Sequence, residues 1–279
     1  GDYLRNNEGK VVSHIQGLYY KTNQLLTFGI TPIYIFDGKP PQEKSDCIKE
    51  RIKKASECKQ KMENTADPEE KKALEKGTIR IKKEYIDDLK HMFGLMGVSY
   101  IDLVEGEAEA YASELCRIGY VDAVVTEDMD TLAYGCPTLI TTCKDKSIKR
   151  PDIVTVFHFE NILIDFKMNH DEFIDMCILC GCDYCPTIPK VGPVRALNYI
   201  QKYKSIENLI NSDEKIIIPE EFKNKYVASR GLFKVFDGKI DLENLPISVS
   251  KYDPDGIYKY LVNSCNMNVK RVQNSLQKF

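Results

Sequence analysis

The sequence predicts an α/β protein in which helices flank a mostly parallel central sheet. Two observations favour this fold class. Short apolar runs typical of buried strands alternate with longer segments typical of helices over residues 32–157. Acidic residues also follow several of these runs, and in parallel sheets functional groups gather beyond the strand ends. With 279 residues and 43% hydrophobic content, the chain can bury a sizeable core.

The first expected strand covers residues 32–36, an apolar run that leads into Asp37 and then a Gly-Lys-Pro-Pro break. Residues 41–90 are rich in lysine and glutamate and poor in large apolar side chains, so we expect helices outside the core. An Asp-Pro pair at 67–68 interrupts them. Residues 44–61 carry seven basic side chains against three acidic ones. Two interpretations stay open: a solvated helical hairpin, or a basic arch that contacts a polyanion.

Strands and helices alternate again after this segment. The expected elements are strands at residues 98–102, 121–126, 137–142 and 153–157, and an alanine-rich helix at 107–117. Asp37 and Asp128 then lie just beyond strands, and the loop after the strand at 98–102 leads to Glu107. Because functional groups gather beyond the carboxyl ends of parallel strands, we expect these acids to meet at one edge of the sheet.

Beyond residue 173 the sequence becomes helical, with a glycine–proline turn inside TIPKVGPVRALNYIQ. Two helices joined by a turn that exposes backbone amides can hold a phosphodiester backbone without reading bases. An ordinary helical hairpin with solvated lysines explains the same residues equally well. The residues alone leave both interpretations open.

Three acidic clusters lie beside apolar runs. Glu107 and Glu109 stand in VEGEAEAYAS, Asp128 and Asp130 in VVTEDMDTLAYG, and Asp183 in ILCGCDYC. Carboxylates crowded near a core repel one another and lose hydration, so they need counter-charge or protons. Divalent cations supply that counter-charge, and Mg²⁺ prefers oxygen ligands. The pattern therefore predicts a metal-dependent enzyme.

The formal net charge of −3 at first argues against a nucleic-acid partner. Two bound divalent ions would offset it, and the basic side chains are concentrated in one segment, so the average charge is a poor guide. No apolar stretch approaches the length that crosses a bilayer, and GDYLRNNEGK carries no secretory signal. We expect a protein that is neither membrane-bound nor secreted.

Ten cysteines occur, and without a secretory signal we expect them to be reduced. Four of them are clustered: Cys177, Cys180, Cys182 and Cys185. One interpretation is a structural zinc site. The favoured one is a set of core thiols, because Cys177 and Cys180 fall in the apolar run FIDMCILC and no second pair has the usual zinc spacing.

Five motifs occur in order along the chain: SHIQGLYYKT, GITPIYIFDGKPPQEKS, EGEAEAYASEL, TEDMDTLAYG, and CILCGCDYCPTI followed by VGPVRAL. With these motifs the chain resembles the flap endonucleases, structure-specific 5′ nucleases of DNA replication and repair. The resemblance runs from near Ser13 to the last residue. It implies one nuclease domain over residues 1–279 with the 5′ nuclease (PIN-like) fold, a helical arch at 41–90 and a helix–two-turn–helix element at 172–210. It also implies a strand and a further ligating aspartate ahead of residue 1, so this chain starts after that N-terminal segment.

The resemblance implies roles for individual residues. The implied metal ligands are Asp37, Glu107 and Glu109 for one ion and Asp128, Asp130 and Asp183 for a second, with Glu109 shared. Lys44 and Arg51 match the basic pair that contacts the scissile phosphate. The implied DNA-binding turn contains Thr187, Lys190, Gly192 and Arg195, together with a K⁺ ion. The family usually has two glycines where Lys190 and Gly192 stand, so Lys190 either alters the K⁺ site or adds a phosphate contact.

The implied activity is that of a Mg²⁺-dependent 5′ flap endonuclease and 5′–3′ exonuclease, with Mn²⁺ able to substitute. Two ions roughly 4 Å apart would activate a water, hold the phosphate and stabilise the departing oxygen. Lys44 and Arg51 stand seven residues apart, nearly two helical turns, so both can face one phosphate. Their positive charge would stabilise the transition state.

The implied partner is branched DNA with a 5′ flap, bound by a monomer. Gln273, Leu276 and Phe279 have the spacing of a partial sliding-clamp peptide, although the segment also fits an ordinary helix. We expect a nuclear location in a cellular eukaryote and a cytoplasmic one in a virus or prokaryote. Two alternatives stay open: a flap-binding module without catalysis, and a zinc-stabilised structural protein built on the clustered cysteines.

Overall fold

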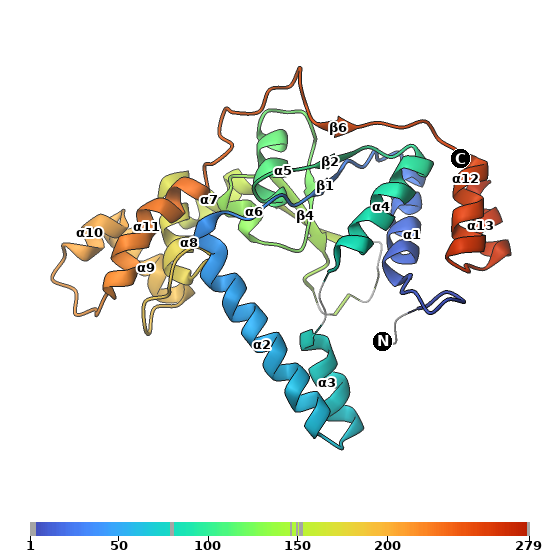
Figure 1. Ribbon diagram of the computed structural model, residues 1–279. Coiled ribbons are helices and arrows are strands. Elements are labelled where there is room, and N and C mark those ends of the chain that lie inside the picture. The colour runs from blue at the N-terminus through green and yellow to red at the C-terminus, as the bar shows by residue number, and fades with distance from the viewer. Residues whose placement is uncertain (1–3, 79–80, 146, 149, 151–152, 278–279) are drawn as a thin grey trace. The chain divides into compact units, whose positions relative to one another are not determined.

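The computed structural model describes residues 4–78, 81–145, 147–148, 150 and 153–277, without the side chains of residues 72 and 75–77 (Figure 1). The chain divides into two compact units. The first unit comprises Gly1–Phe36, Ala55–Leu103 and Pro246–Phe279, and the second comprises Asp37–Lys54 and Val104–Leu245. Every site residue that the sequence suggests through Arg195 belongs to the second unit.

The first unit packs helices against a three-stranded sheet. Its helices are α1 (Ser13–Thr27), α3 (Pro68–Thr78), α4 (Lys83–Met96), α12 (Pro254–Lys259) and α13 (Val269–Leu276), with a π-helical turn at Tyr260–Ser264. The strands are β1 (Tyr34–Phe36), β2 (Tyr100–Asp102) and β6 (Ile247–Ser248), in the order β1-β2-β6. β1 and β2 are parallel, whereas β2 and β6 are antiparallel. α1 lies beside α4, and buried Ile15, Tyr19 and Phe93 belong to the core of this unit (Figure 1).

The second unit also combines a three-stranded sheet with several helices. Its strands are β3 (Val124–Val125), β4 (Thr138–Thr142) and β5 (Val154–His158). β3 and β4 are parallel, and β4 and β5 are antiparallel with Thr138 opposite His158. The helices are α5 (Ala108–Arg117), α6 (Asp130–Ala133), α7 (Phe159–Phe166), α8 (His170–Cys180), α9 (Pro193–Tyr203), α10 (Ile206–Ile210) and α11 (Glu220–Leu232). A 3₁₀ turn at Gln42–Lys44 leads into α2 (Ser45–Asn64), and the division between the units falls inside α2.

The helix starts of the second unit follow local chemistry. At the start of α8, Asn169 and Glu172 form a reciprocal capping box, which satisfies two backbone N–H groups. The Ser205 side chain caps α10 by accepting from Asn208 N. Pro193 begins α9, where its missing N–H removes no intrahelical bond. Helices at these positions are therefore encoded in the sequence.

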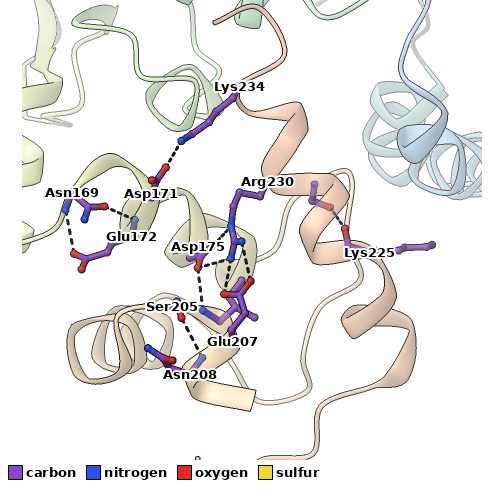
Figure 2. A network of polar contacts seen from close by, with 12 residues as sticks. Asn169, Asp171, Glu172, Asp175, Ser205, Glu207, Asn208, Lys225, Arg230 and Lys234 are labelled. Atoms are coloured by element: carbon purple, nitrogen blue, oxygen red, sulfur yellow. Dashed lines mark hydrogen bonds and ion pairs between the residues drawn. The ribbon is translucent and has the colours of Figure 1, made fainter. Parts of the chain in front are cut away.

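One arginine joins three of these helices (Figure 2). Arg230 on α11 donates to both oxygens of Asp175 on α8, at 2.7 and 2.9 Å, and to both oxygens of Glu207 on α10, at 2.9 and 3.0 Å. Asp175 is buried and also accepts from Ile206 N. Burial raises the pKa of Asp175 although these bonds oppose the rise, whereas the bond from Arg230 lowers the pKa of Glu207. The charge on Asp175 is therefore tolerated only because Arg230 and the backbone partner it.

The α/β prediction is confirmed, and each expected strand is present, mostly as a shorter segment. The strands form two three-stranded mixed sheets instead of one mostly parallel sheet. Apolar runs indicate where strands lie, but pairing depends on long-range contacts that a local pattern does not contain.

The helices after residue 41 are confirmed, with α3 starting at the expected Asp-Pro break. The expectation that residues 41–90 avoid the core is wrong at Leu89, which belongs to α4 and is buried in the core of the first unit. Buried Leu89, Met92, Phe93 and Met96 follow the i, i+3, i+4, i+7 spacing of an apolar helix face. Among the described residues, no helix combines the length and the apolar character needed to cross a bilayer.

Candidate active site

Three acidic side chains come together at the start of α5. Asp37 directly follows β1, Glu107 precedes the first residue of α5, and Glu109 lies in the first turn of that helix. One carboxylate oxygen from each lies within 4.8 Å of the others, a geometry that could hold a metal ion. Asp37 Oδ1 also accepts from Ala108 N at 2.8 Å. The backbone at the helix start thus orients one of the three carboxylates.

A close backbone approach holds this group together. Lys39 and Glu105 form a parallel bridge, and Gly38 N donates to Gly106 O at 3.0 Å. A Cβ atom at Gly38 would lie 2.4 Å from Glu105 N, which is far inside contact distance. The residue after Asp37 must therefore be glycine for the two segments to meet.

Asp128 and Asp130 lie in the turn between β3 and α6. Asp128 Oδ1 accepts from Asp130 N at 2.9 Å, and Asp130 begins α6. Burial raises the pKa of Asp130 to about 6, and the charges of Asp128 and Asp183 add to the rise. Burial likewise raises the pKa of Glu109, helped by Asp37 and Asp128. Neither carboxylate forms an ion pair with a described residue, although Lys44 partly offsets the rise at Asp130. These interactions place both acidic sets in one electrostatic site.

Glu127 anchors this turn and was not singled out from the sequence. It accepts from Thr142 N at 2.8 Å, Thr142 Oγ1 at 3.0 Å and Lys144 Nζ at 2.9 Å. These bonds, the one from Thr142 N above all, lower the pKa of Glu127 to about 2. Its place in the sequence could have indicated this role. Glu127 lies between a strand and the predicted ligand Asp128, where a side chain that bonds to the neighbouring strand can fix the turn.

Asp183 meets a basic face of the α2 segment. Arg51 Nη2 donates to Asp183 Oδ1 and Oδ2 at 2.8 and 2.9 Å, and Lys44 Nζ lies 3.3 Å from Asp183 Oδ2. Lys44 Nζ also donates to Glu107 Oε2 at 2.5 Å. The Cys47 thiol donates to Asp183 Oδ1 at 3.2 Å. Residues 44, 47 and 51 thus share one face, and Cys47 was missed although it lies three and four residues from the predicted pair.

These partners shift the pKa of Asp183 in the opposite direction from the pKa of Asp130 and that of Glu109. Burial would raise the pKa of Asp183, but Cys47, Lys44 and Arg51 outweigh it and lower that pKa. Burial would lower the pKa of Lys44, but Glu107 and Asp183 outweigh it and raise that pKa. Asp183 is therefore ionised and already partnered by cations.

The structure brings some predicted ligands closer than others. In the described part of the chain, one group of at least three potential ligands has oxygens that all lie within 4.8 Å of one another: Asp37, Glu107 and Glu109. Asp128, Asp130 and Asp183 form no second such group among the residues that the structure describes, although Asp128 interacts electrostatically with Glu109 and Asp130 with Glu107. Asp183 instead forms ion pairs with Lys44 and Arg51.

The four clustered cysteines also form no metal-binding group among the residues that the structure describes. Cys182 and Cys185 are bridged through their backbones, and Cys177 packs against the core of the second unit. Burial raises the pKa of Cys182 to about 11 and that of Cys185 to about 12, so both stay protonated at neutral pH. Cys185 lies in the core of the second unit and the other three cysteines pack against it, which fits the core-thiol interpretation.

The predicted DNA-binding turn lies between α8 and α9. Lys190 adopts a left-handed conformation with φ of 65°, and Gly192 immediately precedes α9. Arg195 Nη1 donates to Lys190 O at 3.0 Å, which closes the turn. Thr187 lies against Gly181, where a Cβ atom would lie 2.9 Å from Thr187 Cγ2. Farther along the chain, Gln273 and Leu276 lie on α13, and Phe279 lies outside the described residues.

Two family models match the chain. The XPG N-terminal domain matches residues 2–58, and the XPG I-region matches residues 97–183. Flap endonuclease 1 of Chlamydomonas reinhardtii is 36% identical over 282 residues, covering 99% of this chain and 70% of that protein. Flap endonuclease 1 of Homo sapiens is 33% identical over 283 residues, covering 100% of this chain and 73% of that protein.

Solved structures are similar over nearly the whole chain. Flap endonuclease-1 from Methanococcus jannaschii aligns with a TM-score of 0.71 and 26% identity, covering 99% of this chain and 84% of that one. The catalytic core of Rad2 in complex with DNA substrate aligns with a TM-score of 0.72 and 21% identity, covering 98% and 87%. The second likeness concerns the fold alone.

Proposed function

The chain belongs to the flap endonuclease family, and from that premise we propose that it cuts DNA near single-strand/double-strand junctions by two-metal-ion hydrolysis. The enzyme class is that of a structure-specific nuclease, a phosphodiester hydrolase. The proposal concerns the ions, the ligands, the substrate geometry and the residues that act on the phosphate.

The observation that carries the proposal is the meeting of Asp37, Glu107 and Glu109 within 4.8 Å. The donor set fits Mg²⁺, since it consists of carboxylate oxygens. Burial, together with the charges of Asp37 and Asp128, raises the pKa of Glu109, and a bound cation would offset that cost. We assign these three residues to one ion, and Asp128, Asp130 and Asp183 to a second ion that shares Glu109. Bound Mg²⁺ supplies an activated water and stabilisation of the departing oxygen, and Mn²⁺ can substitute for it.

Lys44 and Arg51 are the groups that would hold the scissile phosphate. Both contact Asp183, so both are directed at the acidic site. Arg51 is largely exposed and Lys44 is largely covered. A phosphate that enters beside Asp183 therefore meets two preorganised cations, which stabilise the extra negative charge of the transition state.

The turn between α8 and α9 would hold duplex DNA. Thr187, Lys190, Gly192 and Arg195 provide the backbone and cationic groups, with a K⁺ ion in the turn. Arg195 engages the carbonyl of Lys190. We assign the ammonium of Lys190 to a phosphate contact. Binding by such groups should weaken steeply with salt concentration.

Three further features belong to the proposal. The substrate is branched DNA with a 5′ flap, bound by a monomer. A sliding clamp would contact Gln273, Leu276 and Phe279. The compartment is that of the DNA: the nucleus in a cellular eukaryote, or the cytoplasm in a virus or prokaryote.

The test uses a 5′-labelled flap duplex in Mg²⁺, with matched duplex lacking the flap. Asp37→Asn and Glu109→Gln should each lose cleavage while retaining flap binding. Glu105→Gln removes a neighbouring exposed carboxylate outside the cluster and should cut like the unaltered chain. Full Mg²⁺-dependent cleavage by both cluster variants would refute the metal assignment. Salt-sensitive flap binding without cleavage by the unaltered chain would instead favour the alternative of a non-catalytic binding module.

A further inference from the structure

Two buried tyrosines connect the segments that carry Asp130 and Asp183. The hydroxyl oxygens of Tyr134 and Tyr184 lie 2.5 Å apart, and the two residues are only 6% and 3% exposed. Tyr134 N donates to Asp130 O at 3.1 Å, and Tyr184 directly follows Asp183. One hydrogen bond thus spans 50 residues of sequence and joins the two acidic segments.

The two tyrosine hydroxyls are enclosed by packed side chains and depend on each other for hydrogen bonding. The ring of Phe233 on α11 packs against both tyrosine rings, with centroid distances of 5.3 and 5.6 Å. Burial raises the pKa of both phenols, so each keeps its proton at neutral pH. Each hydroxyl is the hydrogen-bond partner that the structure gives to the other. A buried hydroxyl without a partner is unfavourable, so the two segments are held at one separation.

Neither acidic segment has much structure of its own to set that separation. α6 is a single turn, Asp130–Ala133, and one turn of helix is marginal by itself. Asp183 lies in the short loop between the end of α8 and the turn that leads to α9. The positions of both carboxylates must therefore be determined by tertiary contacts.

We propose that Tyr134 and Tyr184 are positioning residues that fix the spacing between Asp130 and Asp183 for the second metal ion. The inference rests on the proposed function, because it assigns both aspartates to that ion. The tyrosines do not touch the ion or the DNA; they act through the backbone of α6 and of the loop. Partners that orient metal ligands in this way typically change metal affinity by about 10- to 100-fold when they are altered.

The test separates positioning from packing with Tyr134→Phe, Tyr184→Phe and the double variant. Each single change leaves one buried hydroxyl without a partner, so each should lower the melting temperature. The double change removes both hydroxyls and keeps both rings, so the melting temperature should return close to that of the unaltered chain. Mg²⁺ affinity, measured by calorimetry without DNA, should stay about tenfold weaker in the double variant.

A matched control is Tyr19→Phe in the first unit. Tyr19 is also fully buried, and its hydroxyl lies 2.6 Å from Ser275 Oγ. This variant should lower the melting temperature without changing Mg²⁺ affinity. Unaltered Mg²⁺ affinity in the double tyrosine variant would overturn the positioning role and leave the pair as packing. An unaltered chain that binds no Mg²⁺ would overturn the proposed function itself, which is a different result.

Cleavage kinetics give a second readout. Because the hydroxyl pair acts on the ion site and not on DNA binding, the double variant should regain most of its cleavage rate at saturating Mg²⁺. Its KM for flap DNA should remain unchanged. A raised KM for DNA at saturating Mg²⁺ would contradict the assignment to the metal site.

Discussion

Arg51 donates from one guanidinium nitrogen to both carboxylate oxygens of Asp183, at 2.8 and 2.9 Å. The Arg51 side chain is 62% exposed and that of Asp183 is 25% exposed. The cation can therefore leave the carboxylate toward solvent without disturbing a core. In the proposed mechanism Arg51 binds the phosphate and Asp183 binds a metal ion. The ion pair between Arg51 and Asp183 therefore competes with phosphate binding and with metal binding.

Arg51→Ala should have opposite effects on Mg²⁺ binding and on the cleavage rate. Freeing Asp183 should tighten Mg²⁺ binding without DNA by roughly two- to fivefold, the range expected for an exposed ion pair. Cleavage at saturating Mg²⁺ should nevertheless fall by about 100- to 1000-fold, because a group that stabilises the transition state is lost. Calorimetry and single-turnover cleavage measure the two effects. Lys49→Ala removes an exposed α2 cation that pairs only with Asp46 in the described contacts and should change neither value. Weaker Mg²⁺ binding in Arg51→Ala would contradict the competition.

Asp130 predicts an unusual dependence of stability on pH when divalent ions are chelated. Its folded pKa, about 6, lies above its ordinary value of 3.8 because burial and Asp128 disfavour the charge. The stabilisation from Asp130 is therefore fully present below pH 3.8 and is lost as the pH rises through about 6. Asp130→Asn should be more stable than the unaltered chain at pH 7 by on the order of 2 kcal/mol, and nearly equal at pH 4. Urea unfolding in EDTA at both pH values measures this difference. If Asp130→Asn were instead less stable than the unaltered chain at pH 7, the negative charge of Asp130 would be stabilised by the fold, contrary to this prediction.

Glu127→Ala should loosen the turn that carries Asp128 and Asp130. It removes the acceptor for Thr142 and Lys144, so we expect Mg²⁺ affinity to fall by about tenfold. The melting temperature at pH 7 should fall only slightly, because Glu127 is exposed and solvent screens its bonds to Thr142 and Lys144. The low pKa of Glu127, about 2, means that its stabilisation is present above its ordinary pKa and is lost only as the pH falls through about 2. Glu160→Ala on α7 is the control for loss of an exposed carboxylate. If Glu127→Ala and Glu160→Ala changed Mg²⁺ affinity equally, the anchoring role of Glu127 would be refuted.

Gly38→Ala should damage the first acidic cluster through the backbone. The added methyl would lie 2.4 Å from Glu105 N, so Asp37 and Glu107 must move apart. We expect a destabilisation of about 1–3 kcal/mol, the range of overpacking in dense sites, and loss of cleavage. Gly17→Ala in α1 is the matched control. Nothing lies within 4 Å of its added methyl, so it should stabilise the protein by roughly 0.5–1 kcal/mol. Urea unfolding and the flap assay compare the two variants, and unchanged stability in Gly38→Ala would show that the bridge can shift.

The acids could be predicted because their signals are local. Asp37 follows an apolar strand, and Glu107 and Glu109 open an alanine-rich helix, so sequence position alone suggested that they meet. Lys44 and Arg51 could be placed on one face from helical spacing, and both contact Asp183. Their roles in metal and phosphate binding remain predictions.

The remaining parts of the site depend on contacts between distant segments. Cys47 meets a residue 136 positions away, and Tyr134 meets one 50 positions away. Nothing in a local pattern of apolar and polar residues specifies such pairs. The same reason explains the two separate sheets, because strand propensity does not state which strands pair.

Arg230 has a consequence for how this part of the protein opens. Its single guanidinium satisfies Asp175 on α8 and Glu207 on α10, so none of the three helices can leave alone without stranding a charge. α8, α10 and α11 should therefore unfold as one cooperative block, visible as a shared rate of amide hydrogen exchange. The loop that carries Asp183 extends from one end of this block, and the turn with Lys190 extends toward α9 beside it. Local unfolding of the block would release the Asp183 loop and the Lys190 turn together. Arg230 therefore helps to set how long the folded site persists between opening events.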